Sequence, residues 1–391
     1  MSQPDHKIRK RYAIYAITKH GLTIAKDLQK KLHDCDLWVS EKFLNDAPPH
    51  SLGLQLPMGP RLEPIFFDYD CHIFIISVGA VVRLIAPLIK DKKIDPAVIC
   101  IDDNGQYAIS LLSGHVGRGN EFTHLVAKLI SAQAIVTTAS DVRGTLTVDI
   151  LGRELGWKLE DMQHNITRGC AAVVNERPVL FVQETGDPDF WPLEQALPPG
   201  VDYAVAIPHD VHPYEMLLIA TDRSLETIEP AIYEHAIVYR PKSLVIGIGC
   251  DRDTPKEMLA RGLQKILDEH QLSIKSIAAL ATIDAKANES GLVDLCLEHH
   301  WPLITYSAAA LDQATGVQNP SETVKKYMGT KTVAEGAALL TAECDQLLVS
   351  KQKYFEAGCH KNMTIAICRK IFRQRYEEKN HAQRRTNSEK S

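Results

Sequence analysis

Short apolar runs alternate with amphipathic segments along the first third of the chain. The runs predict buried strands at residues 11–17, 36–40, 73–77, 97–102, 107–112 and 134–138. Between them, apolar residues spaced i, i+3, i+4 predict helices at 22–32, at 81–89 and after Asn120. A stretch rich in Pro and Gly, 45–63, is expected to be a long loop. Helices that alternate with buried strands indicate a parallel α/β sheet.

Two local signals refine this pattern. Asp103-Asn104-Gly105 has the residues of a tight hairpin, because Asn and Gly tolerate positive φ, so 107–112 is expected to be the returning strand. Asn120 is a good helix N-cap, and Glu121 follows it where the helix dipole favours an acid. The apolar stripe within residues 122–130 then packs this helix on the sheet.

The rest of the chain predicts a less regular middle and a second sheet. In the middle we expect a helix at 148–155, strands at 178–182, 201–207 and 216–220, a loop at 187–200, and a linker at 239–242. In the last part we expect strands at 244–247, 274–282, 303–306, 347–349 and 364–368, and a helix at 292–297. Two further helices are predicted to begin at the capping boxes Thr254-Pro255-Lys256-Glu257 and Thr332-Val333-Ala334-Glu335.

The predicted fold is therefore α/β, with N-terminal and C-terminal domains of the parallel type and a smaller mixed α/β middle domain. We expect these domains at residues 1–142, 143–240 and 243–370, followed by a basic tail at 371–391. A chain of 391 residues is too long for one ordinary core, which agrees with several domains.

Composition narrows the classes of function. Apolar residues make up 45% of the chain and charged residues 24%, as in soluble globular proteins, and the formal charge of −5 argues against a nucleic-acid partner. The longest apolar run, 73–82, is too short to span a bilayer, so no membrane partner is expected. The nine cysteines are scattered without a Cys-x-x-Cys pair, which indicates reduced thiols in the cytoplasm and no protein-bound metal.

The stretch Ser113-Gly114-His115-Val116-Gly117-Arg118-Gly119-Asn120 is the leading candidate for chemistry. A glycine-rich turn that leads from a strand into a helix directs backbone amides and the helix dipole at one spot, which suits an anion. Arg118 adds a bidentate donor for a carboxylate or a phosphate. The dipole favours the neutral form of His115, which is able to accept a proton. The alternative interpretation is a tight turn with a surface histidine.

Three more candidates follow predicted strands of the first domain. Arg83 is expected in the first turn of its helix, where a cation opposes the dipole, so it faces either an anion or solvent. Thr138 and Asp141 belong to a run of small hydroxyl and acidic residues at the end of a strand, where ligands bind in parallel sheets. Asp141 either orients His115 or contacts the ligand, and the alternative is a helix cap or turn acid.

The last domain repeats the arrangement of a strand followed by a turn. Gly249 lies in Gly247-Ile248-Gly249-Cys250, which lacks the third glycine of a dinucleotide site. Cys250 has no histidine nearby in sequence and is better explained as a small buried thiol than as a nucleophile. Lys286 follows another strand, and a solvated charge pair with Asp284 is its alternative role.

In order, these motifs resemble the cobalt-precorrin-5A hydrolase family, lactone-opening enzymes of anaerobic cobalamin biosynthesis. The resemblance covers about residues 70 to 370. Its N-terminal part is carried by Gly79-Ala80-Val81-Val82-Arg83, Asp95-Pro96-Ala97-Val98, 109–115 and 137–141, and its C-terminal part by 247–250, 280–286 and 333–337. The family usually has Gly-Gly-Ala-Asn where this chain has Gly117-Arg118-Gly119-Asn120, so the turn gains a cation.

The resemblance implies hydrolysis of the δ-lactone between the ring A acetate and C20 of cobalt-precorrin-5A, with release of acetaldehyde and formation of cobalt-precorrin-5B. The substrate carries the cobalt, so no cofactor of the protein's own is expected. In this hypothesis His115 is the general base and Asp141 orients it, while amides around Gly117 and Asn120 stabilise the oxyanion.

The same hypothesis assigns the carboxylate-rich rim of the substrate to Arg83, Arg118 and Lys286. Ser113, Gly114, Thr138 and Gly249 complete the expected substrate contacts. The expected partner is thus a small cobalt corrinoid, and a homo-oligomer or transient contact with neighbouring pathway enzymes is a further expectation.

Two other functions fit the same residues. A non-catalytic corrinoid carrier is one, because the C-terminal domain also resembles a stand-alone protein of the aerobic pathway. The other is a sugar-phosphate or nucleotide enzyme that uses the same anion-binding turns.

Overall fold

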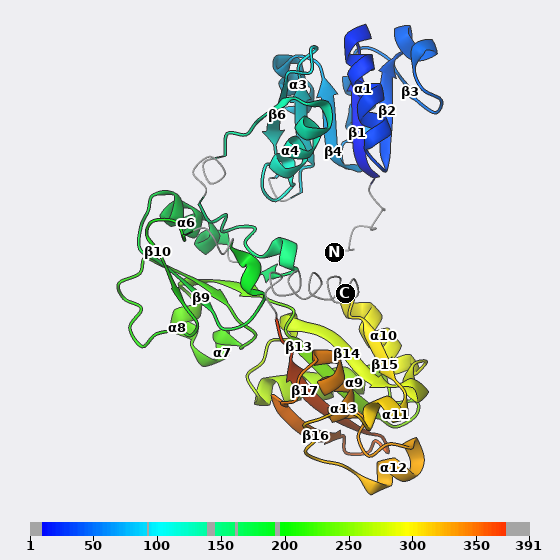
Figure 1. The fold of residues 1–391 in the computed structure, drawn as a ribbon, viewed down its shortest axis with the longest axis vertical. Coiled ribbons are helices and arrows are strands. Elements are labelled where there is room, and N and C mark those ends of the chain that lie inside the picture. Colours follow the sequence, from blue (N-terminus) through cyan, green and yellow to red (C-terminus); the bar gives the residue numbers. More distant parts are fainter. Residues whose placement is uncertain (1–9, 92–93, 139–144, 161–162, 192–195, 373–391) are drawn as a thin grey trace, which may run out of the picture. The chain divides into compact units, whose positions relative to one another are not determined.

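The computed structural model describes residues 10–91, 94–138, 145–160, 163–191 and 196–372, and divides into two compact units, 1–150 and 151–391 (Figure 1). The α/β fold predicted from the sequence is confirmed in three mixed sheets, one in the first unit and two in the second. The domain boundaries given above stay a prediction. No helix in the described ranges is long and apolar enough to cross a bilayer.

The first unit is built on a seven-stranded sheet with the strand order β3-β2-β1-β4-β5-β6-β7. Its strands are β1 (Lys10–Ala16), β2 (Cys35–Ser40), β3 (Leu52–Leu54), β4 (Tyr69–Ile75), β5 (Ala97–Ile101), β6 (Tyr107–Leu112) and β7 (Gln133–Ile135). Its α-helices are α1 (Lys19–Lys31), α2 (Gly59–Leu62), α3 (Val78–Ile85) and α4 (Gly119–Ile130). The predicted loop at 45–63 was wrong in part, since it contains β3 and α2.

Helices cover both faces of this sheet, which explains why its strands are almost continuously apolar. Successive residues of a strand point to opposite faces, so Ile14 packs with α1 and α4 in one core while Tyr15 packs with α3 in another. Ile73 and Phe74 repeat this division in β4.

The hairpin between β5 and β6 confirms the turn predicted at 103–105. Gly105 has φ +67° and its amide donates to the Asp102 carbonyl at 2.9 Å. The Asp102 carboxylate also accepts from the amides of Asn104 and Tyr107. The hairpin makes β6 antiparallel to β5, while β7 pairs parallel with β6. The chain therefore leaves β6 beside the N-terminal ends of β4 and β5. This is the opposite side of the sheet from the C-terminal ends of those two strands.

The first sheet of the second unit has the strand order β10-β9-β11-β12-β8, and only the β12–β8 pair is antiparallel. Its elements are β8 (Lys158–Leu159), α6 (Gln163–Val174), β9 (Val179–Gln183), β10 (Val201–Ala204), β11 (Met216–Ala220), α7 (Leu225–Ile228), α8 (Pro230–Tyr233) and β12 (Ala236–Arg240).

Two predictions for this region were wrong. The helix expected at 148–155 is only a short 3-10 turn, η3 (Arg153–Leu155), because Gly152 and Gly156 on either side of it have positive φ. The linker expected at 239–242 begins inside β12, where Tyr239 and Arg240 are buried.

The last sheet has the strand order β15-β14-β13-β17-β16, in which β13, β14 and β15 are parallel and β17 and β16 are antiparallel. The strands are β13 (Leu244–Cys250), β14 (Ile277–Ile283), β15 (Leu303–Tyr306), β16 (Val349–Phe355) and β17 (Asn362–Arg369). The helices are α9 (Lys256–Glu269), α10 (Ser290–His299), α11 (Ala308–Leu311), α12 (Glu322–Met328) and α13 (Ala334–Ala342).

Neither predicted capping box forms as expected. The N-cap of α9 is Pro255, one residue late, and the hydroxyl of Thr254 donates to the Asp251 carbonyl. The N-cap of α13 is Val333, and the buried carboxylate of Glu335 accepts four hydrogen bonds from the loop around Asn319 and from β16. Glu335 thus holds a loop against the sheet, and the local sequence does not predict this role.

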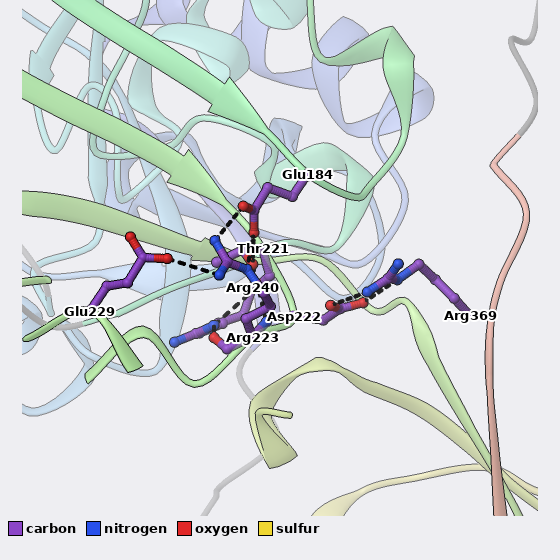
Figure 2. Close-up of polar contacts among 7 residues, drawn as sticks. All are labelled: Glu184, Thr221, Asp222, Arg223, Glu229, Arg240 and Arg369. Atoms are coloured by element: carbon purple, nitrogen blue, oxygen red, sulfur yellow. Dashed lines mark hydrogen bonds and ion pairs between the residues drawn. The ribbon is translucent and has the colours of Figure 1, made fainter. Parts of the chain in front are cut away.

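The two sheets of the second unit are joined by a cluster centred on Asp222, which is 1% exposed. Figure 2 shows its carboxylate facing the guanidinium of Arg369, which donates two hydrogen bonds of 2.8 Å from β17. The hydroxyl of Ser243 donates to the same carboxylate at 2.8 Å, and the Ser273 amide donates to the Asp222 carbonyl at 2.7 Å. Beside it, Arg223 pairs with Glu184 and Glu229 (Figure 2).

Candidate active site

The glycine-rich turn at 113–119 connects β6 to α4 in the first unit. Ser113 has φ +55° and Arg118 has φ +64°, so two non-glycine residues hold the left-handed conformation. The predicted N-cap was wrong: Arg118 is the N-cap, because the amides of Gly119 and Asn120 donate back to Ser113 and Gly114 carbonyls. Asn120 therefore lies inside the first helical turn, where it is 5% exposed.

Asn120 connects three segments of the candidate site. The hydroxyl of Ser110 in β6 donates to its side-chain oxygen at 2.8 Å. Its side-chain nitrogen donates to the hydroxyl of Thr138 at 2.9 Å. The structure thus brings two predicted site residues, Asn120 and Thr138, together, and their contact fixes the segment after β7 against the turn. The Asn120 amide is already bonded to Gly114, so it is not the oxyanion donor we predicted.

The glycines of the turn are needed for close approach of the backbone. A Cβ added at Gly117 would lie 2.4 Å from the Cβ of Ser113, and one at Gly114 would lie 2.7 Å from the side-chain oxygen of Asn120. Real Cβ atoms do not tolerate such distances. The turn is therefore tightly packed around Ser113, whose hydroxyl oxygen is buried and lacks a hydrogen-bond partner in the described part of the chain.

His115 pairs with a residue that the sequence did not indicate. Its Nδ1 lies 3.5 Å from Oδ1 of Asp149, and the two side chains are 17% and 16% exposed. The predicted partner, Asp141, lies outside the described residues. Asp149 was assigned to a helix that does not form, and the only local signal for it is a single acid between Val148 and Ile150 in an apolar run.

The guanidinium of Arg118 contacts two side chains of the helix that it caps. Its Nε donates to Glu121 at 2.7 Å, its Nη2 pairs with the other carboxylate oxygen, and its guanidinium lies 5.4 Å from the ring centre of Phe122. A substrate carboxylate would have to compete with Glu121 for this cation. The predicted anion contact is therefore weakened by an intrahelical pair that i, i+3 spacing could have suggested.

Arg83 is separated from the His115 turn. It lies in the last turn of α3, not the first, so its charge complements the helix dipole and the reason given for a bound anion was wrong. Its Nη1 donates to the Gly79 carbonyl at 2.9 Å, near the edge where β4 ends. Because β6 runs antiparallel to β5, the turn after β6 lies at the opposite edge. The predicted joint role of Arg83 and His115 is not supported.

Gly249 and Lys286 come to the same edge of the C-terminal sheet, because β13 and β14 are parallel. Lys286 is buried, and its ammonium donates to Glu289 at 2.8 Å. Burial alone would raise the pKa of Glu289, but Lys286 and the Asp253 amide hold it below its usual value. Lys286 is thus a buried partner of Glu289, so the alternative of a solvated pair with Asp284 was wrong, and its contact with substrate stays a prediction.

The predicted explanation of Cys250 is supported. Burial raises the pKa of its thiol to about 11, so the thiolate that a nucleophile needs is not formed near neutral pH. Among the described residues, no group of three His, Cys, Asp or Glu side chains is placed to hold a metal ion.

The chemistry that the site can support is therefore concentrated in the first unit. An imidazole beside a largely buried carboxylate, in a turn packed at the start of a helix, is an arrangement suited to general-base catalysis.

Comparison with known proteins gives this site a context. Residues 61–141 match the cobalamin synthesis G N-terminal model, 146–241 the cobalamin biosynthesis central region and 244–368 the cobalamin synthesis G C-terminus. A cobalt-precorrin-5A hydrolase of Priestia megaterium is 40% identical over 361 residues, 91% of this chain and 94% of that protein. One of Salmonella typhimurium is 32% identical and covers 85% of this chain and 92% of its own.

A solved structure of a cobalamin biosynthesis protein G homologue from Sulfolobus solfataricus covers 93% of this chain and 99% of its own, at 20% identity and a TM-score of 0.34. The sequence matches alone are decisive, because they run in one order from residue 61 to residue 368 and one relative extends over 91% of the chain. This chain belongs to the cobalt-precorrin-5A hydrolase family.

Proposed function

We propose that this chain opens the ring A acetate δ-lactone of cobalt-precorrin-5A and releases acetaldehyde to give cobalt-precorrin-5B in cobalamin biosynthesis. Family membership supports the substrate and the reaction. The observation that supports the site is the His115–Asp149 pair at the turn between β6 and α4. The proposed general base is His115, which takes a proton from the attacking water.

The reaction divides into two parts. Water adds to the lactone carbonyl, its proton passes to His115, and the tetrahedral intermediate collapses by breaking the bond between the acyl carbon and the ring oxygen. This leaves a free acetate and a hydroxyl on the two-carbon unit at C20. Deprotonation of that hydroxyl then breaks the carbon–carbon bond, acetaldehyde departs, and the bonding electron pair passes into the macrocycle.

An oxyanion forms in the first part and needs donors. Among the amides that we predicted around Gly117 and Asn120, the Asn120 amide bonds to the Gly114 carbonyl, so the Gly117 amide is the proposed donor. Arg118 is proposed to approach a substrate carboxylate only by exchange with Glu121. We also propose that the chain works in the cytoplasm, since all nine cysteines are free thiols.

The test is acetaldehyde release from purified protein mixed with cobalt-precorrin-5A. We expect turnover by the natural chain and a loss of at least about 10²-fold in kcat for His115→Ala, the usual effect of removing a general base. His124→Ala is the matched control, because His124 is exposed in α4, the helix that follows the His115 turn. Tight spectral binding of the corrinoid without acetaldehyde would instead identify a carrier, and near-normal kcat for His115→Ala would remove His115 from the chemistry.

A further inference from the structure

We propose that Asp149 is the positioning residue of the site, which fixes the ring orientation and the tautomer of His115. The inference rests on the proposed function only in that it takes His115 to be the base. Oδ1 of Asp149 is buried and lies 3.5 Å from Nδ1 of His115. Both side chains are mostly shielded from water, at 17% and 16% exposure, so solvent does little to weaken their attraction.

The chemistry of the two groups determines the direction of the interaction. An ionised carboxylate only accepts hydrogen bonds, so a hydrogen bond between the two groups requires the proton of a neutral His115 to be on Nδ1. The lone pair then lies on Nε2, and that nitrogen takes the proton from water. Without the carboxylate, this contact no longer favours a proton on Nδ1, and the share of the protein with the wrong tautomer for catalysis rises. The distance of 3.5 Å allows a hydrogen bond after a small shift, as in many sites without substrate.

The backbone around Asp149 is suited to this role. Leu146 and Val148 are buried, at 2% and 1% exposure, and anchor the segment that carries Asp149. This segment belongs to the first unit, as does the His115 turn, although the two residues are 34 positions apart in sequence. The pair therefore joins the turn to a chain segment held by its own apolar anchors.

The experiment compares the natural chain with Asp149→Asn and with Asp70→Asn, an exposed aspartate of β4, as control. The first measurement is the ¹⁵N spectrum of the histidine rings of the free protein near neutral pH, in which the His115 signal is assigned from its loss in His115→Gln. We expect a protonated Nδ1 in the natural chain and in Asp70→Asn, and a shift of the proton toward Nε2 in Asp149→Asn. The second measurement is turnover, where we expect kcat to fall about 10²-fold or more and KM to change less than about 3-fold.

Each outcome decides the proposal. An unchanged His115 tautomer in Asp149→Asn, or kcat within 2-fold of the natural chain, would overturn it. If Asp149→Asn does not fold, the natural chain suffices, because a protonated Nδ1 supports the proposal and a protonated Nε2 contradicts it. The ring spectrum needs no substrate, so it still answers the question if His115→Ala shows that the proposed general base is wrong.

Discussion

At the scale of single residues, His72 shows how burial determines a protonation state. It is fully buried in β4 between the rings of Tyr15 and Phe66. The Phe66 carbonyl can only accept, so Nε2 of His72 carries the proton and donates to it at 2.8 Å, while Nδ1 accepts from the Tyr15 hydroxyl at 3.0 Å. Burial lowers the pKa of His72 to about 4, because the charged ring would lose its hydration.

This shift predicts a pH-dependent stability of the first unit. The unfolded chain binds a proton at His72 near pH 6.5 and the folded chain only near pH 4, so the stabilisation is complete above pH 6.5 and is lost as the pH falls toward 4. The loss amounts to about 3 kcal/mol over this window. In His72→Phe, the free energy of unfolding should be lower at pH 7. It should no longer decrease between pH 6.5 and pH 4 because of this residue.

Urea unfolding between pH 4 and pH 7, followed by the fluorescence of Trp38 with the other three tryptophans replaced by Phe, measures the effect. Trp38 suits this purpose because its ring lies 6.5 Å from that of Tyr15, within the same cluster. Equal slopes in the natural chain and in His72→Phe would show that His72 does not titrate in this way.

Residue chemistry was predictable from sequence where neighbours along the chain determine it. The SGHVGRGN motif identified the turn, and the absence of a nearby histidine agrees with the raised pKa of the Cys250 thiol, although that residue is only half-buried. Partners from distant segments were not predictable. Asp149 meets His115, 34 positions away, only because the fold places the segment after β7 beside the turn between β6 and α4.

At the scale of elements, one hairpin decides which candidate residues meet. The Asn-Gly turn was predicted, and so was the returning strand, β6. Because of this hairpin, the chain leaves β6 on the side of the sheet opposite to the C-terminal end of β4. The His115 turn is therefore separated from Arg83. A parallel sheet with all ligand groups at one edge was therefore too simple an expectation, even though almost every strand of that sheet was located.

The turn between β6 and α4 is closely packed at Gly117. A substitution there tests whether catalysis needs this close packing. In Gly117→Ala, the new Cβ would lie 2.4 Å from the Cβ of Ser113, so the turn must move. A shift of about 1 Å at a catalytic group costs about 10²-fold in rate, and we expect a loss of that order in kcat. In Gly59→Ala, the control in α2, nothing lies within 4 Å of the added Cβ, and kcat should be unchanged.

Acetaldehyde release measures kcat for both variants, and circular dichroism checks that the helices remain. If Gly117→Ala keeps a kcat within 2-fold of the natural chain, the turn tolerates movement and its close packing is not needed for catalysis.

At the scale of the whole molecule, the connection between the two sheets of the second unit escaped prediction. The segment expected to be a linker is partly a buried strand, and Arg240 pairs there with Glu160 at 2.7 Å. Asp222 and Arg369 are 147 positions apart in sequence, so no local pattern indicates that they bond. From sequence alone, charged residues at the ends of strands are expected to be solvated, and only the packing of one sheet against the other buries Asp222 and brings Arg369 to it.

The Asp222–Arg369 pair should therefore control how firmly the two sheets hold together. In Arg369→Ala, the carboxylate of Asp222 stays buried but loses two charge-assisted hydrogen bonds, which costs about 2 kcal/mol. We expect amide hydrogen exchange to become about 30-fold faster at both 221–224 and 271–276, because the Ser273 and Ser224 amides bond across this junction. Arg261→Ala removes an equally bidentate pair, with Glu356, but Arg261 is 59% exposed, so exchange there should change little. Faster exchange in only one of the two segments would mean that the pair stabilises a single sheet and does not join the two.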